Sequence, residues 1–231
     1  MSNKLIVLKI GTNTLFDNAE INFDMLNTLA SSIKKYRKQN INFVIVTSGA
    51  VQSGANELNL LERPKNLKEL QVASAVGQVS LINTYKEIFN KHDINIAQIL
   101  ISKNVLEDRS QFINTTEALN GLIAKNILPI INENDVVATE ELKFGDNDRL
   151  SAIVSIILKA DKLVLITDKE GLYDSDPEIS EEAQKIENIE YNSEELNELI
   201  PKSVSGKGIG GFSTKIMAAQ MAGFSGIETQ I

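Results

Sequence analysis

Two lysines that are far apart in the sequence each stand beside glycine, a setting that suits phosphate binding. Lys9 is followed by Gly11-Thr12, and Lys215 ends the glycine-rich segment of residues 205–215. Backbone N–H groups that glycine leaves accessible, together with a lysine ammonium group, can hold phosphate oxygens, above all where a helix begins. The sequence therefore predicts that both segments contribute to a site for a phosphorylated ligand.

The glycine-rich segment also matches other patterns in part. Gly206, Gly208 and Gly211 are spaced as in G-x-G-x-x-G, but the preceding Pro-Lys-Ser-Val is not the buried strand that a dinucleotide-binding fingerprint requires. Gly211 is followed by Phe212-Ser213, which does not fit a Walker loop. These mismatches count against a nicotinamide-dependent dehydrogenase. Taken alone, the segment is also compatible with a loop that ends in a helix cap.

A third polar segment, Gly145-Asp146-Asn147-Asp148, stands where a helical pattern begins. One Asp or Asn at this point could serve as the helix cap, and that interpretation is sufficient for a single residue. Three such residues in succession exceed what a cap requires. The surplus carboxylate is therefore a candidate for positioning a cation or an amino group.

The available side chains favour phosphoryl transfer over thiol or imidazole catalysis. The chain has no cysteine, and its one histidine, His92, lies far from these segments in the sequence, so mechanisms built on either group are not expected. Phosphoryl transfer relies on positioning and positive charge instead. A carboxylate acceptor, such as a glutamate side chain with a pKa of about 4.3, is already ionised at neutral pH and needs no general base. Lys9, Lys215, glycine N–H groups and Mg²⁺ would offset the repulsion between the two anions.

The elements that must position these residues alternate along the chain. Short apolar runs predict strands at residues 5–10, 41–47, 94–101, 127–131 and 163–167, and helical patterns cover residues 23–39, 67–90, 109–126, 147–159 and 212–222. The runs are apolar at consecutive positions, as in strands buried on both faces. This order predicts an α/β fold, a three-layer αβα sandwich with a mostly parallel central sheet.

The remaining segments carry weaker signals. Residues 136–144 and 171–189 are too polar for buried strands and are expected to form hairpins or lids, while residues 227–231 resemble the start of another strand. We find no repeat and no linker, so a single domain over residues 1–231 is expected.

Polar or small residues follow four of the predicted strands. They are Gly11-Thr12-Asn13, Ser48-Gly49-Ala50, Asn132-Glu133-Asn134-Asp135 and Asp168-Lys169-Glu170-Gly171. Each group alone could be turn chemistry, since these residue types dominate turns. In open α/β sheets, however, ligands bind at the carboxyl ends of the strands. Four such groups together predict a functional edge of the sheet.

Charge and hydropathy limit the kinds of partner. The 231 residues carry a net charge of −8, and residues 174–198 hold ten acidic residues against one lysine, so the rest of the chain sums to +1. Without a basic stripe, nucleic acid is not expected as a partner. No apolar run reaches the length of a membrane span or a signal-peptide core, so we expect no membrane association and a cytoplasmic protein.

Six motifs, in order, resemble those of the glutamate 5-kinase family within the amino-acid kinase superfamily. The motifs are Lys9-x-Gly11-Thr12, Val46-Thr47-Ser48-Gly49-Ala50, Ile131-Asn132-Glu133-Asn134-Asp135, Gly145-Asp146-Asn147-Asp148-x-Leu150-Ser151-Ala152, Thr167-Asp168-x-x-Gly171-Leu172-Tyr173 and Gly210-Gly211-x-Ser213-Thr214-Lys215. The resemblance extends from Lys9 to Gly226. The third and fourth motifs are the more specific pair, and they favour this family over aspartate, acetylglutamate, carbamate and UMP kinases.

The resemblance implies a reaction and a role for each matched residue. ATP would phosphorylate the side-chain carboxylate of L-glutamate to γ-glutamyl phosphate, the first step of proline biosynthesis, with Mg²⁺ bound mainly through the phosphates and no metal site made by the protein. Lys9, Lys215 and Asp148 would be catalytic, with Asp148 holding the two lysines. Glutamate would bind to Ser48, Gly49, Ala50, Asp135 and Asn147, with Asp135 facing its ammonium group. ATP would contact Lys9, Gly11, Thr167, Asp168, Tyr173, Ile209, Gly210, Gly211, Phe212, Ser213, Thr214 and Lys215.

The resemblance also implies feedback inhibition by proline and a homodimer or homotetramer. Relative to the family, we expect a short form that lacks the RNA-binding-like PUA domain and the last strand and helix of the kinase domain. Ile209 and Phe212 stand where the family pattern has Thr and Met. Two alternatives stay open: a regulatory module that binds a nucleotide or an amino acid without turnover, and a superfamily member that acts on a different carboxylate.

Overall fold

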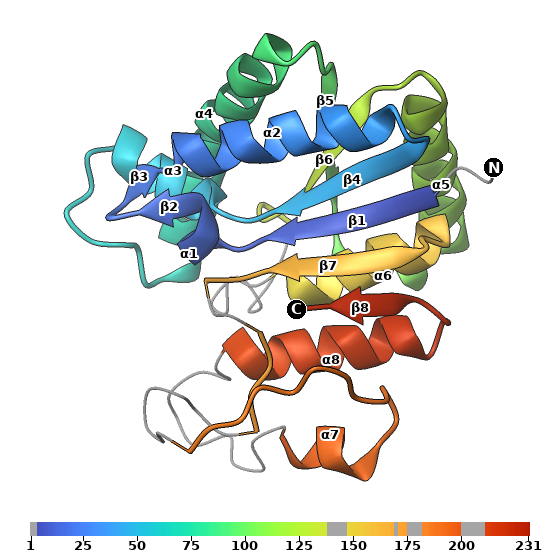
Figure 1. Cartoon of the computed structure of the whole chain (residues 1–231). Helices are drawn as coiled ribbons and strands as arrows, with labels where there is room; N and C mark the ends of the chain where they lie inside the picture. Colours follow the sequence, from blue (N-terminus) through green and yellow to red (C-terminus); the bar gives the residue numbers. More distant parts are fainter. Residues whose placement is uncertain (1–3, 138–146, 169–170, 175–181, 200–210) are drawn as a thin grey trace.

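A computed structural model describes residues 4–137, 147–168, 171–174, 182–199 and 211–231. Within these residues, six strands form one sheet in the order β5-β6-β4-β1-β7-β8, and every neighbouring pair is parallel (Figure 1). The strands are β1 Lys4–Ile10, β4 Ile41–Thr47, β5 Ile96–Ile101, β6 Leu128–Glu133, β7 Lys162–Ile166 and β8 Glu228–Gln230. The five predicted strands are confirmed, and the strand expected at residues 227–231 is present as β8.

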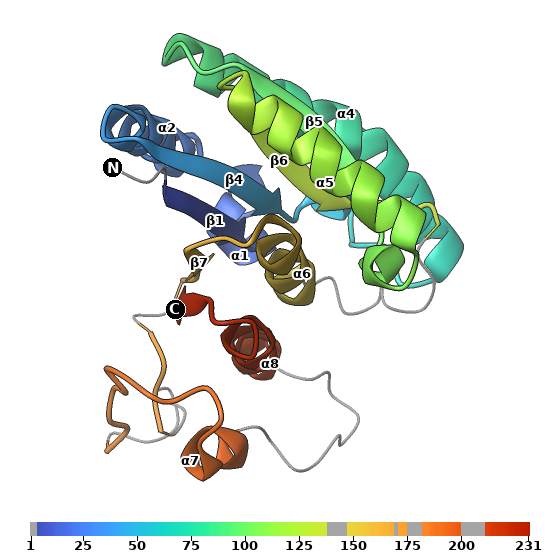
Figure 2. The same cartoon turned by 90° about the vertical axis from the view of Figure 1, so that its right-hand side faces the viewer.

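Helices cover both faces of the sheet, as Figure 2 shows. On one face, α2 Phe23–Arg37 and α4 Leu67–Lys91 bury side chains against the sheet. On the other face, α5 Arg109–Ala124, α6 Asp148–Leu158 and α8 Gly211–Gly223 form a second apolar cluster with the strands. The predicted three-layer αβα sandwich is therefore confirmed.

Several short elements have no counterpart in the prediction. They are α1 Thr12–Leu15, the antiparallel pair β2 Phe16–Asp17 and β3 Glu20–Ile21, the 3₁₀ helix Lys103–Leu106 and α7 Glu194–Glu198. The helix α3, Ala50–Glu57, follows β4 after the turn at Ser48-Gly49. Elements this short have too few residues to establish a hydrophobic period.

The two polar segments expected to form hairpins or lids are described only in part. Leu172–Asp174 and Gln184–Ile186 pair in antiparallel fashion around Tyr173 and Lys185, as in a hairpin. Of the segment at residues 136–144, residues 138–144 lie outside the described residues. The strand predicted to end at Ile131 continues to Glu133, because Asn132 and Glu133 remain paired with β5.

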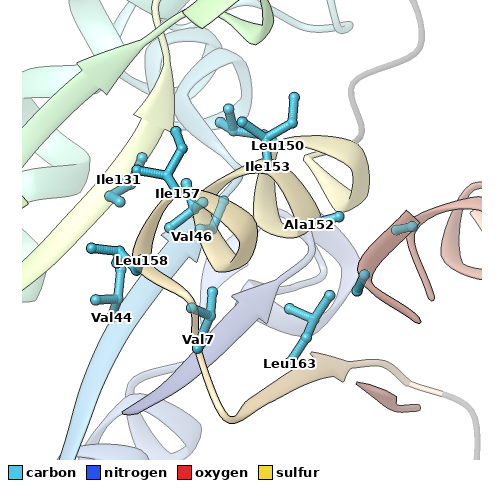
Figure 3. Packing of buried hydrophobic residues seen from close by; sticks show 14 of the residues in the cluster. Val7, Val44, Val46, Ile131, Leu150, Ala152, Ile153, Ile157, Leu158 and Leu163 are labelled. Atoms are coloured by element: carbon cyan, nitrogen blue, oxygen red, sulfur yellow. The ribbon is translucent and has the colours of Figure 1, made fainter. Parts of the chain in front are cut away.

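The helix α6 is buried along almost its whole length. Figure 3 shows Leu150, Ile153 and Ile157 of this helix packed against Val46 of β4 and Ile131 of β6. Because α6 also contacts α5 and α8, it has almost no solvent-facing side. The helix therefore has a fixed position, and its first residues meet the carboxyl ends of β4 and β6.

The close contact between α3 and α4 depends on two glycines. A methyl group on Gly77 of α4 would overlap the carbonyl oxygen of Ala50 and the backbone of Gly54 in α3. We expect Gly77→Ala to lower the free energy of unfolding by about 3 kcal/mol, because one helix must shift to admit the added carbon. Urea denaturation measures this change.

Gly121→Ala is the matched control, since nothing lies within 4 Å of a methyl group at that helical position. It should leave stability unchanged or raise it by up to about 1 kcal/mol. Equal stability of the Gly77→Ala variant and the parent protein would contradict the close packing of α3 on α4.

Candidate active site

The carboxylate of Asp148 binds both lysines that the sequence singled out. Lys9 Nζ lies 2.7 Å from Asp148 Oδ1, and Lys215 Nζ lies 3.1 Å from Oδ2. The carboxylate is completely buried, while the side chains of Lys9 and Lys215 are 3% and 13% exposed. Residues from β1, α6 and α8 thus converge on one point, as the motifs predicted.

The cluster brings two positive charges to one buried carboxylate. Lys9 and Lys215 share Asp148, and a buried charge needs such a partner. Thr214 also donates a hydrogen bond to Asp148 Oδ2, at 2.9 Å. Asp148 is the first residue of α6, where the helix N-terminus favours a carboxylate. The arrangement suits the binding of an anion beside the two ammonium groups.

The sequence of β1 explains why Lys9 points toward α6. Alternate residues of a strand face the same side, and Val7 packs in the cluster that includes α6. Lys9 therefore lies on that face too, below the beginning of the helix. Gly11 follows it, and a side chain there would come within 3.3 Å of Lys9 Nζ. The glycine leaves room for the ammonium group.

Asn147 fixes the beginning of α6 to the ends of two strands. It occupies the N-cap position, but its side chain makes no capping bond. Instead, Nδ2 donates to the carbonyl oxygen of Thr47 at 2.6 Å and to Asn132 Oδ1 at 2.7 Å. Both amide hydrogens are thereby used, and only an acceptor, Oδ1, remains for a ligand. A simple cap therefore does not account for Asn147, whereas Asp146 lies outside the described residues.

Tyr85 connects α4 to the same network. Its side chain is fully buried, and this burial raises the pKa of the phenol well above its ordinary value. Thr47 Oγ1 lies 2.9 Å from the phenol oxygen and donates to the carbonyl oxygen of Ser48 at 3.0 Å. Because the single hydroxyl hydrogen of Thr47 is used in that bond, Tyr85 is the donor to Thr47.

The turn Ser48-Gly49-Ala50 joins β4 to α3. Gly49 has φ +102°, and a side chain at this position would meet the ring of Phe16 at 2.7 Å, so glycine is required here. The hydroxyl of Ser48 is buried and has no hydrogen-bond partner among the described residues. A buried hydroxyl without a partner is unfavourable, and a ligand could supply one.

Asp135 lies two residues beyond the end of β6 and is half-buried. Ser74 of α4 donates a short hydrogen bond to its Oδ2. Gln71, also on α4, donates to the carbonyl oxygen of Val136 at 3.1 Å. The turn that follows β6 is therefore held against α4.

The residues expected to contact ATP are less completely described. Thr167 and Asp168 follow β7, which pairs with β1, and Thr167 donates to Asp168 at 3.3 Å. Phe212 packs in a small apolar cluster with Leu172, Leu196 and Ile216, and Ser213 is buried. The backbone of Tyr173 pairs with Lys185, and no described contact links Tyr173 to Lys9 or Lys215. Gly211 begins α8, while Ile209 and Gly210 lie outside the described residues.

Sequence reasoning missed several polar residues that shape the site. Asn132, quoted only as part of a motif, accepts from Asn147 and from the backbone of Glu133. Ser74 and Tyr85 lie on a long helix whose pattern predicts burial but not a polar partner. Only the positions of polar residues on a predicted buried face could have drawn attention to them.

The described residues contain neither a metal-binding cluster nor a helix that could span a membrane. There, no three His, Asp or Glu side chains gather in a group that could hold a metal ion. None of the helices in those residues combines the length and the apolar character that crossing a membrane requires.

A parallel sheet between two helix layers, with two lysines and a buried aspartate at the carboxyl ends of its strands, places the chain among α/β proteins of the three-layer sandwich class. The chain belongs to the amino acid kinase family, whose sequence model matches residues 4–231. A solved structure of UMP kinase from Ureaplasma parvum has a TM-score of 0.63 and 21% identity, and covers 100% of this chain and 90% of that one. A structure of isopentenyl phosphate kinase has a TM-score of 0.64 and 16% identity, and covers 97% and 89%. At these identities the two structures show the fold alone.

Two relatives with higher sequence identity are both named glutamate 5-kinase. A glutamate 5-kinase of Prochlorococcus marinus (strain MIT 9301) is 43% identical over 233 residues, which cover 99% of this chain and 64% of that protein. A glutamate 5-kinase of Haemophilus influenzae (strain PittGG) is 40% identical over 232 residues, which cover 100% of this chain and 63% of that protein. The chain thus spans slightly less than two thirds of the length of these relatives.

Proposed function

We propose that the chain transfers the γ-phosphoryl group of ATP to the side-chain carboxylate of L-glutamate, giving γ-glutamyl phosphate and ADP. The observation that carries the proposal is the convergence of Lys9 and Lys215 on the buried carboxylate of Asp148. The identity of the acceptor, L-glutamate, is inferred from the names of the relatives and from the motifs at the strand ends. The proposal includes a single amino-acid kinase domain over residues 1–231.

In the proposed reaction, a carboxylate oxygen of glutamate forms a bond to the γ-phosphorus. The bond from that phosphorus to the bridging oxygen breaks, and ADP leaves with the electron pair. The acceptor is already ionised, so no proton has to be removed from it. The work of the protein is therefore positioning and charge stabilisation.

Lys9 and Lys215 would stabilise the negative charge on the phosphoryl oxygens and on the leaving group. Asp148 would keep the two ammonium groups at a fixed separation, because each lysine contacts a different carboxylate oxygen. Thr214, whose hydroxyl contacts Oδ2, would help to fix that carboxylate. The two ammonium groups suit a polyphosphate, and Mg²⁺ bound mainly to that polyphosphate would neutralise further charge.

Glutamate would bind at the turns after β4 and β6. The buried Ser48 hydroxyl can interact with a ligand, and Asn147 offers only Oδ1, an acceptor that suits an ammonium group. Asp135 supplies a carboxylate for the same ammonium group. Gly49 and Ala50 would approach the substrate through their backbone.

The proposed reaction is tested by incubating the protein with ATP, Mg²⁺, L-glutamate and hydroxylamine. We expect ADP release that depends on glutamate, and γ-glutamyl hydroxamate formed from the trapped acyl phosphate. Tight ATP binding without glutamate-dependent turnover would instead favour the regulatory-module alternative.

Asp135→Ala should raise the KM for glutamate about 10- to 100-fold and change kcat much less, because it removes a charged partner of the substrate ammonium group. Steady-state ADP release at varied glutamate measures both constants. Asp93→Asn is the control, since this exposed carboxylate pairs only with Lys34 among the described residues. An unchanged KM in Asp135→Ala would move the substrate site elsewhere.

The proposal also covers the biological setting. It includes a place in the first step of proline biosynthesis, feedback inhibition by proline, a homodimer or homotetramer, and a cytoplasmic location. These features rest on the resemblance to glutamate 5-kinases. Size-exclusion chromatography with light scattering, and ADP release at increasing proline, would test them.

A further inference from the structure

We infer that Ser74 is a positioning residue for recognition of the substrate amino group, and that it acts through Asp135. The inference rests on the proposed function. Ser74 lies on α4, is only 1% exposed, and donates a short hydrogen bond to Asp135 Oδ2. None of the motifs that suggested the substrate residues includes Ser74.

The position of Asp135 explains why it needs such a partner. The last backbone hydrogen bond from this segment to β5 runs from the N–H of Asn134 to the carbonyl oxygen of Ile101, at 2.8 Å, and Asp135 is the first residue beyond it. The sheet therefore does not fix the direction of the Asp135 carboxylate. The backbone turns there, with the N–H of Val137 donating to the carbonyl oxygen of Asn134 at 3.1 Å. A hydroxyl that donates to one carboxylate oxygen restricts the rotation of the group and sets the direction in which it can meet an ammonium group.

The face of α4 that carries Ser74 is a rigid support. Gln71 lies three residues earlier, on the same side of the helix, and donates to the carbonyl oxygen of Val136. Gly77, three residues later, contacts the start of α3 directly after the Ser48 turn. Further along, Tyr85 donates to Thr47 at the end of β4. One helix therefore holds both segments that would bind glutamate, and Ser74 is its contact with the carboxylate of Asp135.

Removing this hydroxyl should act on binding rather than on chemistry. Ser74→Ala leaves the carboxylate of Asp135 in place but removes the hydroxyl that helps to orient it, so the KM for glutamate should rise about 5- to 20-fold. The kcat and the KM for ATP should stay within about twofold, because the hydroxyl of Ser74 donates to Asp135 and not to the groups that would hold the phosphates. Ser74→Cys keeps the size of the side chain and a weak donor, and should lie between the parent protein and Ser74→Ala.

The decisive measurement is a double-mutant cycle with Asp135. In the Asp135→Ala background, Ser74→Ala should change the KM for glutamate less than twofold, because the partner is already absent. Ser53→Ala is the matched control, since its buried hydroxyl has no partner among the described residues. The thermal midpoint of each variant shows that it is folded.

The outcomes separate this inference from the proposed function. An active parent protein whose glutamate KM is the same in Ser74→Ala would overturn the role of Ser74 alone. An equal rise in KM with and without Asp135 would also overturn it, since the effect would then be one of packing. A parent protein without glutamate-dependent ADP release would overturn the proposed function, and this inference with it.

Discussion

Replacing Lys215 by methionine is expected to lower kcat about 1,000-fold, while the KM for glutamate changes less than about threefold. Methionine keeps most of the length and apolar character of the lysine stem but removes the ammonium group. That charge stabilises the transition state more than the bound substrates, because negative charge develops on the phosphoryl oxygens and the leaving group as the bond breaks. The loss of one such donor typically costs two to three orders of magnitude in rate.

Steady-state ADP release at varied ATP and glutamate measures this effect. Lys34→Met is the matched control, because Lys34 is partly exposed and its ion pair with Asp93 lies on the surface. Its kinetics should equal those of the parent protein. Near-normal turnover in Lys215→Met would show that the assigned role of Lys215 is wrong.

Replacing Asp148 by asparagine should affect both stability and catalysis. The side chain keeps its volume but loses the charge that pairs with Lys9 and Lys215, so two buried ammonium groups lose the carboxylate that they share. Breaking a buried ion pair in this way typically costs several kcal/mol. We expect the free energy of unfolding to fall by about 3 kcal/mol and kcat to fall by about three orders of magnitude.

Urea denaturation and ADP release test the two effects separately. Asp108→Asn is the control for removal of an aspartate at a helix start, because Asp108 caps α5 and asparagine caps equally well. A variant at Asp148 with the stability and kcat of the parent protein would contradict the central position of this carboxylate.

Much of the fold could be predicted because its sheet is buried on both faces. Consecutive apolar residues such as Val7-Leu8 and Val44-Ile45 mark strands that helices cover on each side, and the two members of each pair belong to opposite clusters. The helix α6 could be predicted from its apolar run alone. Its predicted end at Lys159 agrees with the structure, in which this residue follows the helix with φ +50°.

The site residues that could be predicted are those that lie in a recognisable sequence motif. Lys9, Asp148 and Lys215 each lie in a motif, and the structure brings them together. Tyr85 and Ser74 could not be predicted, because a polar residue on the buried side of a helix looks like any other core position until its partner is known. The roles of Asn132 and Asn147 depend on two strand ends and a helix start meeting in space, which no single segment of the sequence shows.

A coupled assay of ADP release across five acceptors tests the central claim most directly. Glutamate, aspartate, N-acetylglutamate, carbamate and UMP would each be supplied with ATP and Mg²⁺, to the parent protein and to Lys9→Ala. We predict turnover of the parent protein with glutamate only, and a loss of that turnover in Lys9→Ala. An equal response of the two proteins to glutamate, or a preference for another acceptor, would contradict the account.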